Sequence, residues 1–289
     1  MYKQIAANKR NTVLIMIIFI IIISAIGGVF AFAFRDWGIG ISIFVIAVVY
    51  TIIQYFASSS LAIAMTGAKE ITKKDYPVFY NTVENITQTA GLPMPKVCVI
   101  NDPAPNAFAA GRDPDHATVV ATTGLLDIMS KTELEAVVGH EVSHIKNYDI
   151  RVSMITFGLV CIIGFIADLG LRMSYFGKDE DRSPVGFIIL LLTAIFAPLA
   201  ASLAQLAISR EREYLADASS VNLTRYPEGM IAALKKLDEH SRPMRRQNAA
   251  TEALYINNPM KKGTLSSLFS THPPIEKRIE RLENGKKTF

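Results

Sequence analysis

The sequence predicts a mainly α-helical membrane protein with a smaller α+β domain in the cytosol. Half of its 289 residues are hydrophobic and its mean hydropathy is +0.27, which is typical of a chain that lies partly in lipid. Crossing a bilayer takes about 20 mostly apolar residues, and four stretches of this chain are long enough. The segments between and after them are polar and carry strand-like and helix-like patterns.

The four predicted transmembrane helices form two hairpins, in residues 1–65 and 152–208. The spans themselves lie at about 13–34, 39–60, 152–171 and 187–208. The first span resembles a signal peptide in its basic start, but its apolar core exceeds the usual 7–15 residues, so we expect a retained anchor. For the second hairpin the alternative is a buried pair of helices in a soluble domain.

Charges beside the spans predict the orientation. Lysine and arginine are concentrated at the N-terminus, at the start of residues 66–151 and after residue 208. The positive-inside rule therefore places both termini and both long polar segments in the cytosol. The net charge of +4 suits an anionic membrane surface, and the chain lacks the basic, aromatic-rich stripe typical of nucleic-acid binding.

The two polar segments, 66–151 and 209–289, are expected to fold together as one cytosolic α+β domain with a small sheet. Turn and breaker residues delimit its elements. Thr132 and Glu135 resemble a capping box for a helix that follows. Residues 240–268 are expected to be the least ordered. The other expected elements are a helix closed by Gly91, strands at 95–101 and 105–111, a strand that leads into a helix over 117–129, and a last helix at 270–283 with proline in its first turn.

The motif His140-Glu141-Val142-Ser143-His144 matches H-E-x-x-H. Residues four apart share one face of a helix, so both imidazoles can reach one metal ion. Glu141 is then placed to take a proton from a metal-bound water, whose pKa zinc lowers to about 7. The alternative is a helix with two surface histidines. His116, in a turn, and His240 are expected on the surface.

A catalytic zinc needs a third protein ligand. The metzincin pattern requires glycine and histidine where this chain has Asn147 and Ile150, which excludes that class. A second helix, beginning near Ser209, supplies Glu211, Glu213 and Asp217, of which Glu213 and Asp217 lie on one face. One could bind the metal while the other orients a ligand histidine. The alternative is a charged helix turn at the membrane surface.

This combination of H-E-x-x-H, a downstream "REYLAD" and flanking apolar spans resembles the HtpX family. These are bacterial membrane-bound zinc metalloproteases of the heat-shock response, related to the CAAX prenyl proteases. The resemblance covers nearly the whole chain and extends to "PNAFAAG" and "THPP". It implies a zincin-like domain of the gluzincin type, in which His140, His144 and Glu213 bind one Zn²⁺, Glu141 is catalytic and Asp217 orients a ligand.

Two weaker candidates complete the predicted site. Residues Asn106, Ala107, Phe108 and Ala109 resemble an edge strand that could bind a peptide substrate by backbone pairing, or simply a short strand. His272 could stabilise the oxyanion of the tetrahedral intermediate, or only begin a helix before two prolines.

The predicted function is zinc-dependent endoproteolysis at the bacterial cytoplasmic (inner) membrane. The resemblance implies polypeptide substrates, mainly damaged membrane proteins, and a role in protein quality control under stress. One alternative is a non-catalytic, zinc-stabilised membrane scaffold or chaperone; another is a transporter that uses Asp168. His144 lies eight residues before the third span and Glu213 five after the fourth, so we expect both segments to continue membrane helices.

Overall fold

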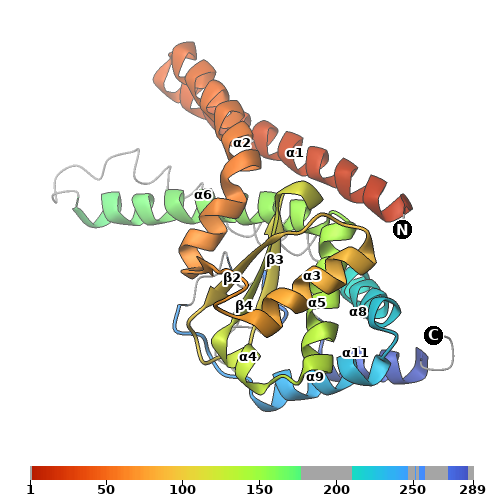
Figure 1. Ribbon diagram of the computed structural model, residues 1–289. Helices are drawn as coiled ribbons and strands as arrows, with labels where there is room; N and C mark the ends of the chain where they lie inside the picture. Colours follow the sequence, from red (N-terminus) through yellow and green to blue (C-terminus); the bar gives the residue numbers. More distant parts are fainter. Residues whose placement is uncertain (1, 177–209, 247–250, 252–253, 258–272, 286–289) are drawn as a thin grey trace.

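A computed structural model describes residues 2–176, 210–246, 251, 254–257 and 273–285 (Figure 1). Two long helices project from a body in which further helices pack on a small sheet. The predicted fourth span at 187–208, His272 and most of the stretch 240–268 lie outside the described residues.

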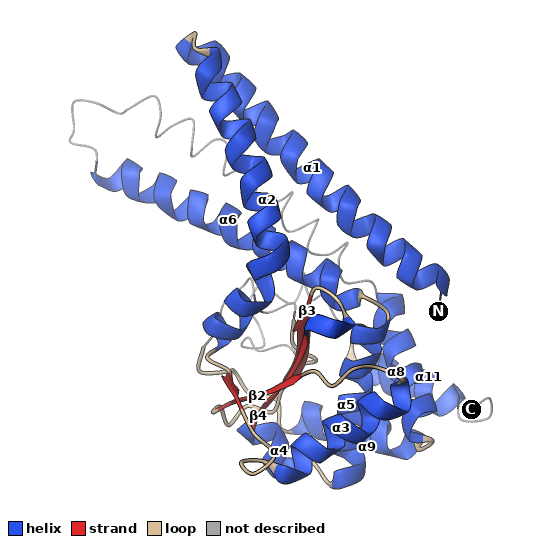
Figure 2. Cartoon of the chain, turned by 45° about the horizontal axis from the view of Figure 1, so that its top comes forward, coloured by secondary structure: helices blue, strands red, loops and turns tan. Residues whose placement is uncertain are grey.

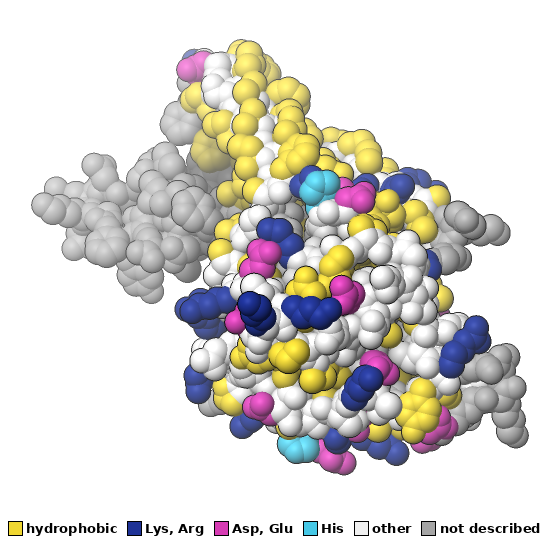
Figure 3. Space-filling model, viewed as in Figure 1, with side chains coloured by type: hydrophobic (Ala, Val, Ile, Leu, Met, Phe, Trp, Pro, Cys, Tyr) yellow, Lys and Arg dark blue, Asp and Glu magenta, His cyan; other side chains and the backbone are white. Residues whose placement is uncertain are grey.

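The projecting hairpin consists of α1 (Tyr2–Phe34) and α2 (Trp37–Thr66). Asp36 caps α2, because its Oδ1 accepts a hydrogen bond from the amide of Gly38 at 2.8 Å. Among the described residues, these two helices have the length and composition to cross a membrane, with mean hydropathies of 3.1 and 2.2. Many of their large apolar side chains are exposed, and Figure 3 shows this apolar surface on the hairpin while charged side chains gather on the body.

The predicted third span lies within α6 (Asp149–Phe176). The first part of this helix is buried by protein: Val152, Ile155 and Leu159 pack against Ile15 and Phe19 of α1. The start of the predicted span therefore contacts the N-terminal hairpin rather than lipid. The described part of the chain thus supports two candidate membrane helices of the four expected.

The sheet has the strand order β1-β2-β4-β3, and β3 (Ala107–Gly111) lies at one edge. Strand β4 (Ala117–Thr122) pairs antiparallel with β3 and parallel with β2 (Lys96–Ile100), while β1 (Lys69–Glu70) pairs antiparallel with β2. The predicted strand at 105–111 is thus an edge strand. Two short elements flank β4, namely the 3-10 helix η1 (Pro114–His116) and α4 (Thr123–Ile128).

The remaining helices lie on one side of this sheet (Figure 2). Helix α3 (Pro77–Ala90) ends, as predicted, at Gly91, whose φ of +69° lies in the left-handed region. Helix α5 (Lys131–Lys146) carries the H-E-x-x-H motif. The same core contains α8 (Arg210–Thr224), α9 (Pro227–Glu239) and α11 (Ile275–Gly285).

The capping box of α5 differs from the predicted one. Ser130, not Thr132, precedes the first helical residue with an extended backbone. Its amide donates to Glu133 Oε2 at 2.7 Å, and the Glu133 amide donates to Ser130 Oγ at 3.5 Å. Thr132 lies inside the helix, where it cannot act as the cap.

The expectation that α5 continues into the third span is wrong. Helix α5 ends at Lys146, Tyr148 has a φ of +61°, and α6 begins at Asp149. The Tyr148 ring lies under two cations, with Lys9 Nζ at 4.4 Å and the Arg151 guanidinium carbon at 4.8 Å from its centroid. This break turns the start of α6 back toward the histidines.

Candidate active site

The two histidines of α5 face the same point. They lie one helical turn apart, and their Nε2 atoms are separated by 3.1 Å. His140 is almost fully buried, and 15% of the His144 side chain is exposed. Their rings meet edge to face, with centroids 4.7 Å apart.

Helix α8 brings Glu213 to this point. Its Oε2 lies 3.6 Å from His140 Nε2, and its Oε1 lies 3.5 Å from His144 Nε2. Each of the three residues offers a ligand atom, and these atoms lie within 4.8 Å of one another. The structure thus brings together His140, His144 and Glu213, the residues that the sequence analysis selected as metal ligands.

Close packing of α5 and α8 makes this approach possible. A Cβ atom placed on Gly139 would lie 2.8 Å from Ser220 Oγ, so no larger residue fits there without a shift. Ser220 Oγ in turn donates a hydrogen bond of 2.6 Å to the carbonyl of Ala136. The glycine beside His140 therefore sets how near the helix that carries Glu213 can lie.

A carboxylate holds the outer nitrogen of each imidazole. Asp217 Oδ1 lies 2.9 Å from His140 Nδ1, and Asp149 Oδ2 lies 3.0 Å from His144 Nδ1. When each Nδ1–H donates to its carboxylate, both Nε2 lone pairs face each other and Glu213. Such an arrangement is repulsive unless a cation lies between them, so this donor set fits a divalent metal ion.

The electrostatics of the site also favour a positive charge. Burial lowers the pKa of His140, but hydrogen bonds to Asp217 and Glu213 outweigh it and raise this pKa to about 9. Burial likewise lowers the pKa of His144, and Asp149 and Glu213 more than compensate. Carboxylates that stabilise an imidazolium stabilise a metal cation in the same place.

Asp149 was not predicted as part of the site. It begins α6, and it can face His144 only because the chain turns at Tyr148. The sequence does place this carboxylate only five residues after the motif, which could have marked it as a candidate. In a continuous helix, however, it would lie on a different face from the histidines.

Arg278 of α11 was also not predicted. It is 1% exposed, and its Nε and Nη2 donate to Asp217 at 2.9 and 2.6 Å. Its Nη1 lies 3.8 Å from Glu213 Oε2. The available signal was an arginine on the apolar face of a short helix, three residues after Ile275 and four before Leu282.

Glu141 lies beside the first histidine and is 2% exposed. Its carboxylate also contributes to the electrostatic potential at Arg278. Burial lowers the pKa of this guanidinium, whereas Asp217 and the neighbouring glutamates, Glu141 included, raise it overall. A buried carboxylate adjacent to the ligand cluster is suitably placed to act as a general base.

Strand β3 places the predicted substrate-binding residues at the sheet edge. The Asn106 carbonyl accepts the Thr122 amide at 3.0 Å and so faces β4, which directs the backbone groups of Ala107 and Ala109 outward. The Ile256 amide donates to the Ala107 carbonyl at 3.0 Å. The chain itself thus occupies the first outward position, and no other described residue hydrogen-bonds the outward groups at Ala109.

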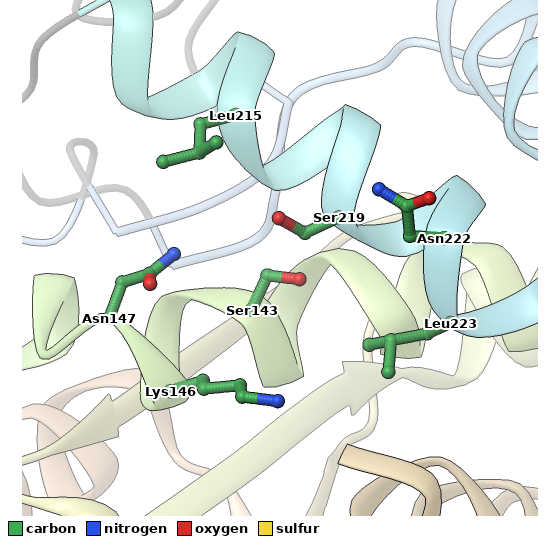
Figure 4. Close-up of a pocket in the computed structure, with 7 residues that line it drawn as sticks. All are labelled: Ser143, Lys146, Asn147, Leu215, Ser219, Asn222 and Leu223. Carbon is green, nitrogen blue, oxygen red and sulfur yellow. The ribbon is translucent and has the colours of Figure 1, made fainter. Parts of the chain in front are cut away.

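A surface pocket of about 210 Å³ lies between α5 and α8 (Figure 4). Ser143 and Ser219 extend into the space between the two helices. None of the three candidate metal ligands lines it, so this pocket is not the catalytic centre. Its lining residues are Ser143, Lys146, Asn147, Leu215, Ser219, Asn222 and Leu223.

The predicted surface histidines, His116 and His240, are exposed.

The apolar hairpin and the buried H-E-x-x-H cluster define a membrane-associated metalloprotease. Residues 78–286 match the model of peptidase family M48, and the chain belongs to this family. Family membership implies a bound metal ion. This chain is 50% identical over 287 residues to a "Protease HtpX homolog" from Tropheryma whipplei (strain Twist), with 98% of each chain covered.

A second relative agrees with this assignment, and a solved structure has a similar fold. A "Protease HtpX homolog" from Streptococcus pyogenes serotype M5 (strain Manfredo) is 47% identical over 297 residues, covering 98% of this chain and 99% of the relative. The fold is similar to the crystal structure of Ste24p from S. mikatae, with a TM-score of 0.50 and 19% identity. That match covers 98% of this chain and 67% of Ste24p.

Proposed function

We propose that this protein is a zinc-dependent endopeptidase of the bacterial cytoplasmic membrane that cuts polypeptides on the cytosolic side. The observation that carries the proposal is the convergence of His140, His144 and Glu213 within 4.8 Å, with Glu141 buried beside them. Two imidazole nitrogens and one carboxylate are the protein ligands of a catalytic zinc site with an open fourth position.

His140, His144 and Glu213 would hold the ion, and Asp217 and Asp149 would keep the two imidazoles in the tautomer that leaves Nε2 free to bind it. When bound, zinc supplies Lewis-acid polarisation of the scissile carbonyl and a lowered pKa for the attacking water. Glu141 accepts the proton of that water and passes it to the leaving amine. His272 is proposed to donate to the developing oxyanion.

An extended substrate would add to the outer edge of β3, at Ala109. There no described residue hydrogen-bonds the outward backbone groups, while the Ala107 carbonyl already accepts the Ile256 amide. Backbone pairing accepts many sequences, which suits an enzyme that degrades damaged proteins. The proposed substrates are membrane proteins, and the proposed role is quality control under stress.

The proposed topology has four membrane helices and both termini in the cytosol. The apolar hairpin of α1 and α2 supports the first pair. Lysine and arginine at the N-terminus and after residue 208 support the orientation.

The test is metal analysis of the purified protein together with proteolysis by wild type and Glu141→Gln. We expect one Zn²⁺ per chain in both proteins, cleavage by wild type that a chelator abolishes, and a loss of at least about 100-fold in the variant. Equal zinc content without any cleavage by wild type would instead support the scaffold or chaperone alternative.

A further inference from the structure

The N-terminal end of the first membrane helix reaches the candidate metal centre. Asn8 of α1 is 0% exposed. Its Nδ2 donates to the Asn147 carbonyl at 2.8 Å and to Asp149 Oδ1 at 2.6 Å. Both partners are acceptors, so the chemistry of the contacts fixes the orientation of the Asn8 amide.

These contacts form a chain that ends at a candidate metal ligand. The Asp149 carboxylate accepts from Asn8 with one oxygen and faces His144 Nδ1 with the other, at 3.0 Å. Arg212 Nε lies 3.8 Å from the oxygen that Asn8 contacts. Because both oxygens are engaged, the contact with Asn8 of α1 fixes the plane of the Asp149 carboxylate. The carboxylate in turn fixes the orientation of the His144 imidazole.

The surrounding packing holds Asn8 in place. One residue along, Lys9 Nζ lies 4.4 Å from the centroid of the Tyr148 ring, at the break between α5 and α6. Further along α1, Ile15 and Phe19 pack against the first turns of α6. The position of the Asn8 side chain therefore depends on how α1 packs against the body.

We infer that Asn8 is a positioning residue of the metal centre, acting on His144 through Asp149. The inference rests on the metal site of the proposed function. Without the Asn8 amide, the carboxylate loses a charge-assisted hydrogen bond and can rotate, so the His144 ring is held less firmly. Metal affinity then depends on how helix α1 packs, although α1 contributes none of the candidate ligands.

The experiment measures metal affinity of the full-length protein in detergent by competition with a chelator. Removing an outer partner of a ligand typically costs 10–100-fold in affinity, and we expect Asn8→Ala to weaken Zn²⁺ binding by about tenfold. The absorption spectrum of the Co²⁺-loaded protein should also change. Asn11→Ala is the matched control, since Asn11 lies on the same helix, is half-buried and makes none of these contacts. We expect wild-type affinity and spectrum from it.

A double-mutant cycle separates positioning from folding. If Asn8 acts through the carboxylate, Asn8→Ala should cause no further loss of affinity in an Asp149→Ala background. Multiplied losses would overturn the inference, because they would assign Asn8 an independent effect. Asn8→Leu, which keeps the buried volume, should reproduce the tenfold loss and provides the test if the alanine variant does not fold.

The outcomes also separate this inference from the proposed function. Wild-type affinity in Asn8→Ala and Asn8→Leu overturns the inference and leaves the protease assignment standing. Normal Zn²⁺ binding by wild type without any cleavage overturns the protease assignment and leaves the inference standing. A wild-type protein that binds no Zn²⁺ overturns both.

Discussion

Arg278 donates two hydrogen bonds to Asp217, which joins the C-terminal helix α11 to the helix that carries Glu213. Both side chains are almost fully buried. The same carboxylate lies 2.9 Å from His140 Nδ1, so the arginine, the aspartate and the histidine form one continuous polar cluster. The C-terminal helix thus supports the candidate metal centre through Asp217.

Replacing Arg278 with methionine should destabilise the fold strongly. Removing one partner of a buried ion pair leaves an uncompensated charge and typically costs about 3–5 kcal/mol. We expect Arg278→Met to lower the thermal unfolding midpoint and to weaken Zn²⁺ binding. Arg281→Met is the matched control on the same helix. Its exposed partner Glu211 lies 3.4 Å away, and exposed pairs contribute about 0–1 kcal/mol. Equal effects of both variants would contradict this account.

Removing the metal should lower stability through the ligand cluster. A ligand that binds only the folded state stabilises it by about 2.7 kcal/mol at a concentration 100 times its Kd. We expect a chelator to lower the unfolding midpoint of wild type but not that of His144→Ala. His240→Ala is the control, because this exposed histidine should leave the shift unchanged. A shift that survives in His144→Ala would place the ion elsewhere.

Acid should weaken the start of α5 through Glu133. Burial raises the pKa of this carboxyl, but Lys236, at 2.7 Å, and Ser130 outweigh it and lower the pKa below its usual 4.5. The contribution to stability is therefore present above pH 4.5 and is lost as the pH falls through the lowered pKa.

Glu133→Gln should therefore destabilise the protein by about 1 kcal/mol at neutral pH, the usual contribution of a helix cap. The difference from wild type should shrink below pH 4.5, as measured by urea unfolding at a series of pH values. Glu135→Gln is the control, because its lysine partner lies 3.9 Å away and is largely exposed. A difference that stays constant with pH would show that the carboxylate charge is not responsible.

Adding a methyl group at Gly139 should push α8 away from α5. A Cβ there would lie 2.8 Å from Ser220 Oγ, and overpacking of this kind costs about 1–3 kcal/mol. We expect Gly139→Ala to weaken Zn²⁺ binding, because Glu213 moves away from the histidines. Adding Ser220→Ala, which removes the clashing oxygen, should restore part of the affinity. Unchanged Zn²⁺ affinity in the single variant would contradict this account, because it would show that Glu213 does not move away from the histidines.

Substrates tethered to the membrane should be cut faster than the same sequence in solution. The apolar hairpin packs against α6, whose first residue contacts His144, so the site lies close to the segment proposed to enter the bilayer. The measurement compares one cleavage sequence, with and without a membrane anchor, on protein reconstituted in vesicles. Equal rates would remove the proposed role of the bilayer in presenting substrates.

The local part of the site could be predicted from sequence because helix geometry alone determines it. His140 and His144 are four residues apart, and any α-helix places them on one face. Glu213 and Asp217 follow the same rule on α8. Strand and helix patterns likewise predicted α3, the strand β3 and the helix at the C-terminal end, while they left open whether β3 lies at an edge.

The remaining features depend on contacts between distant segments. Left-handed backbone is uncommon in residues other than glycine, so Tyr148 gave no warning of the break that brings in Asp149. Both Ser130 with Glu133 and Thr132 with Glu135 match the pattern of a capping box. The choice between them follows from Lys236 of α9, which lies 2.7 Å from Glu133 and is more than a hundred residues away in sequence.

The candidate ligands come from both sides of the stretch that separates His144 from Glu213 in the sequence. During synthesis, the chain would therefore emerge with two histidines that cannot yet complete a coordination sphere. In the proposed protease, activity would therefore have to await the docking of α8 against α5, so a chain still being synthesised would not cut its neighbours.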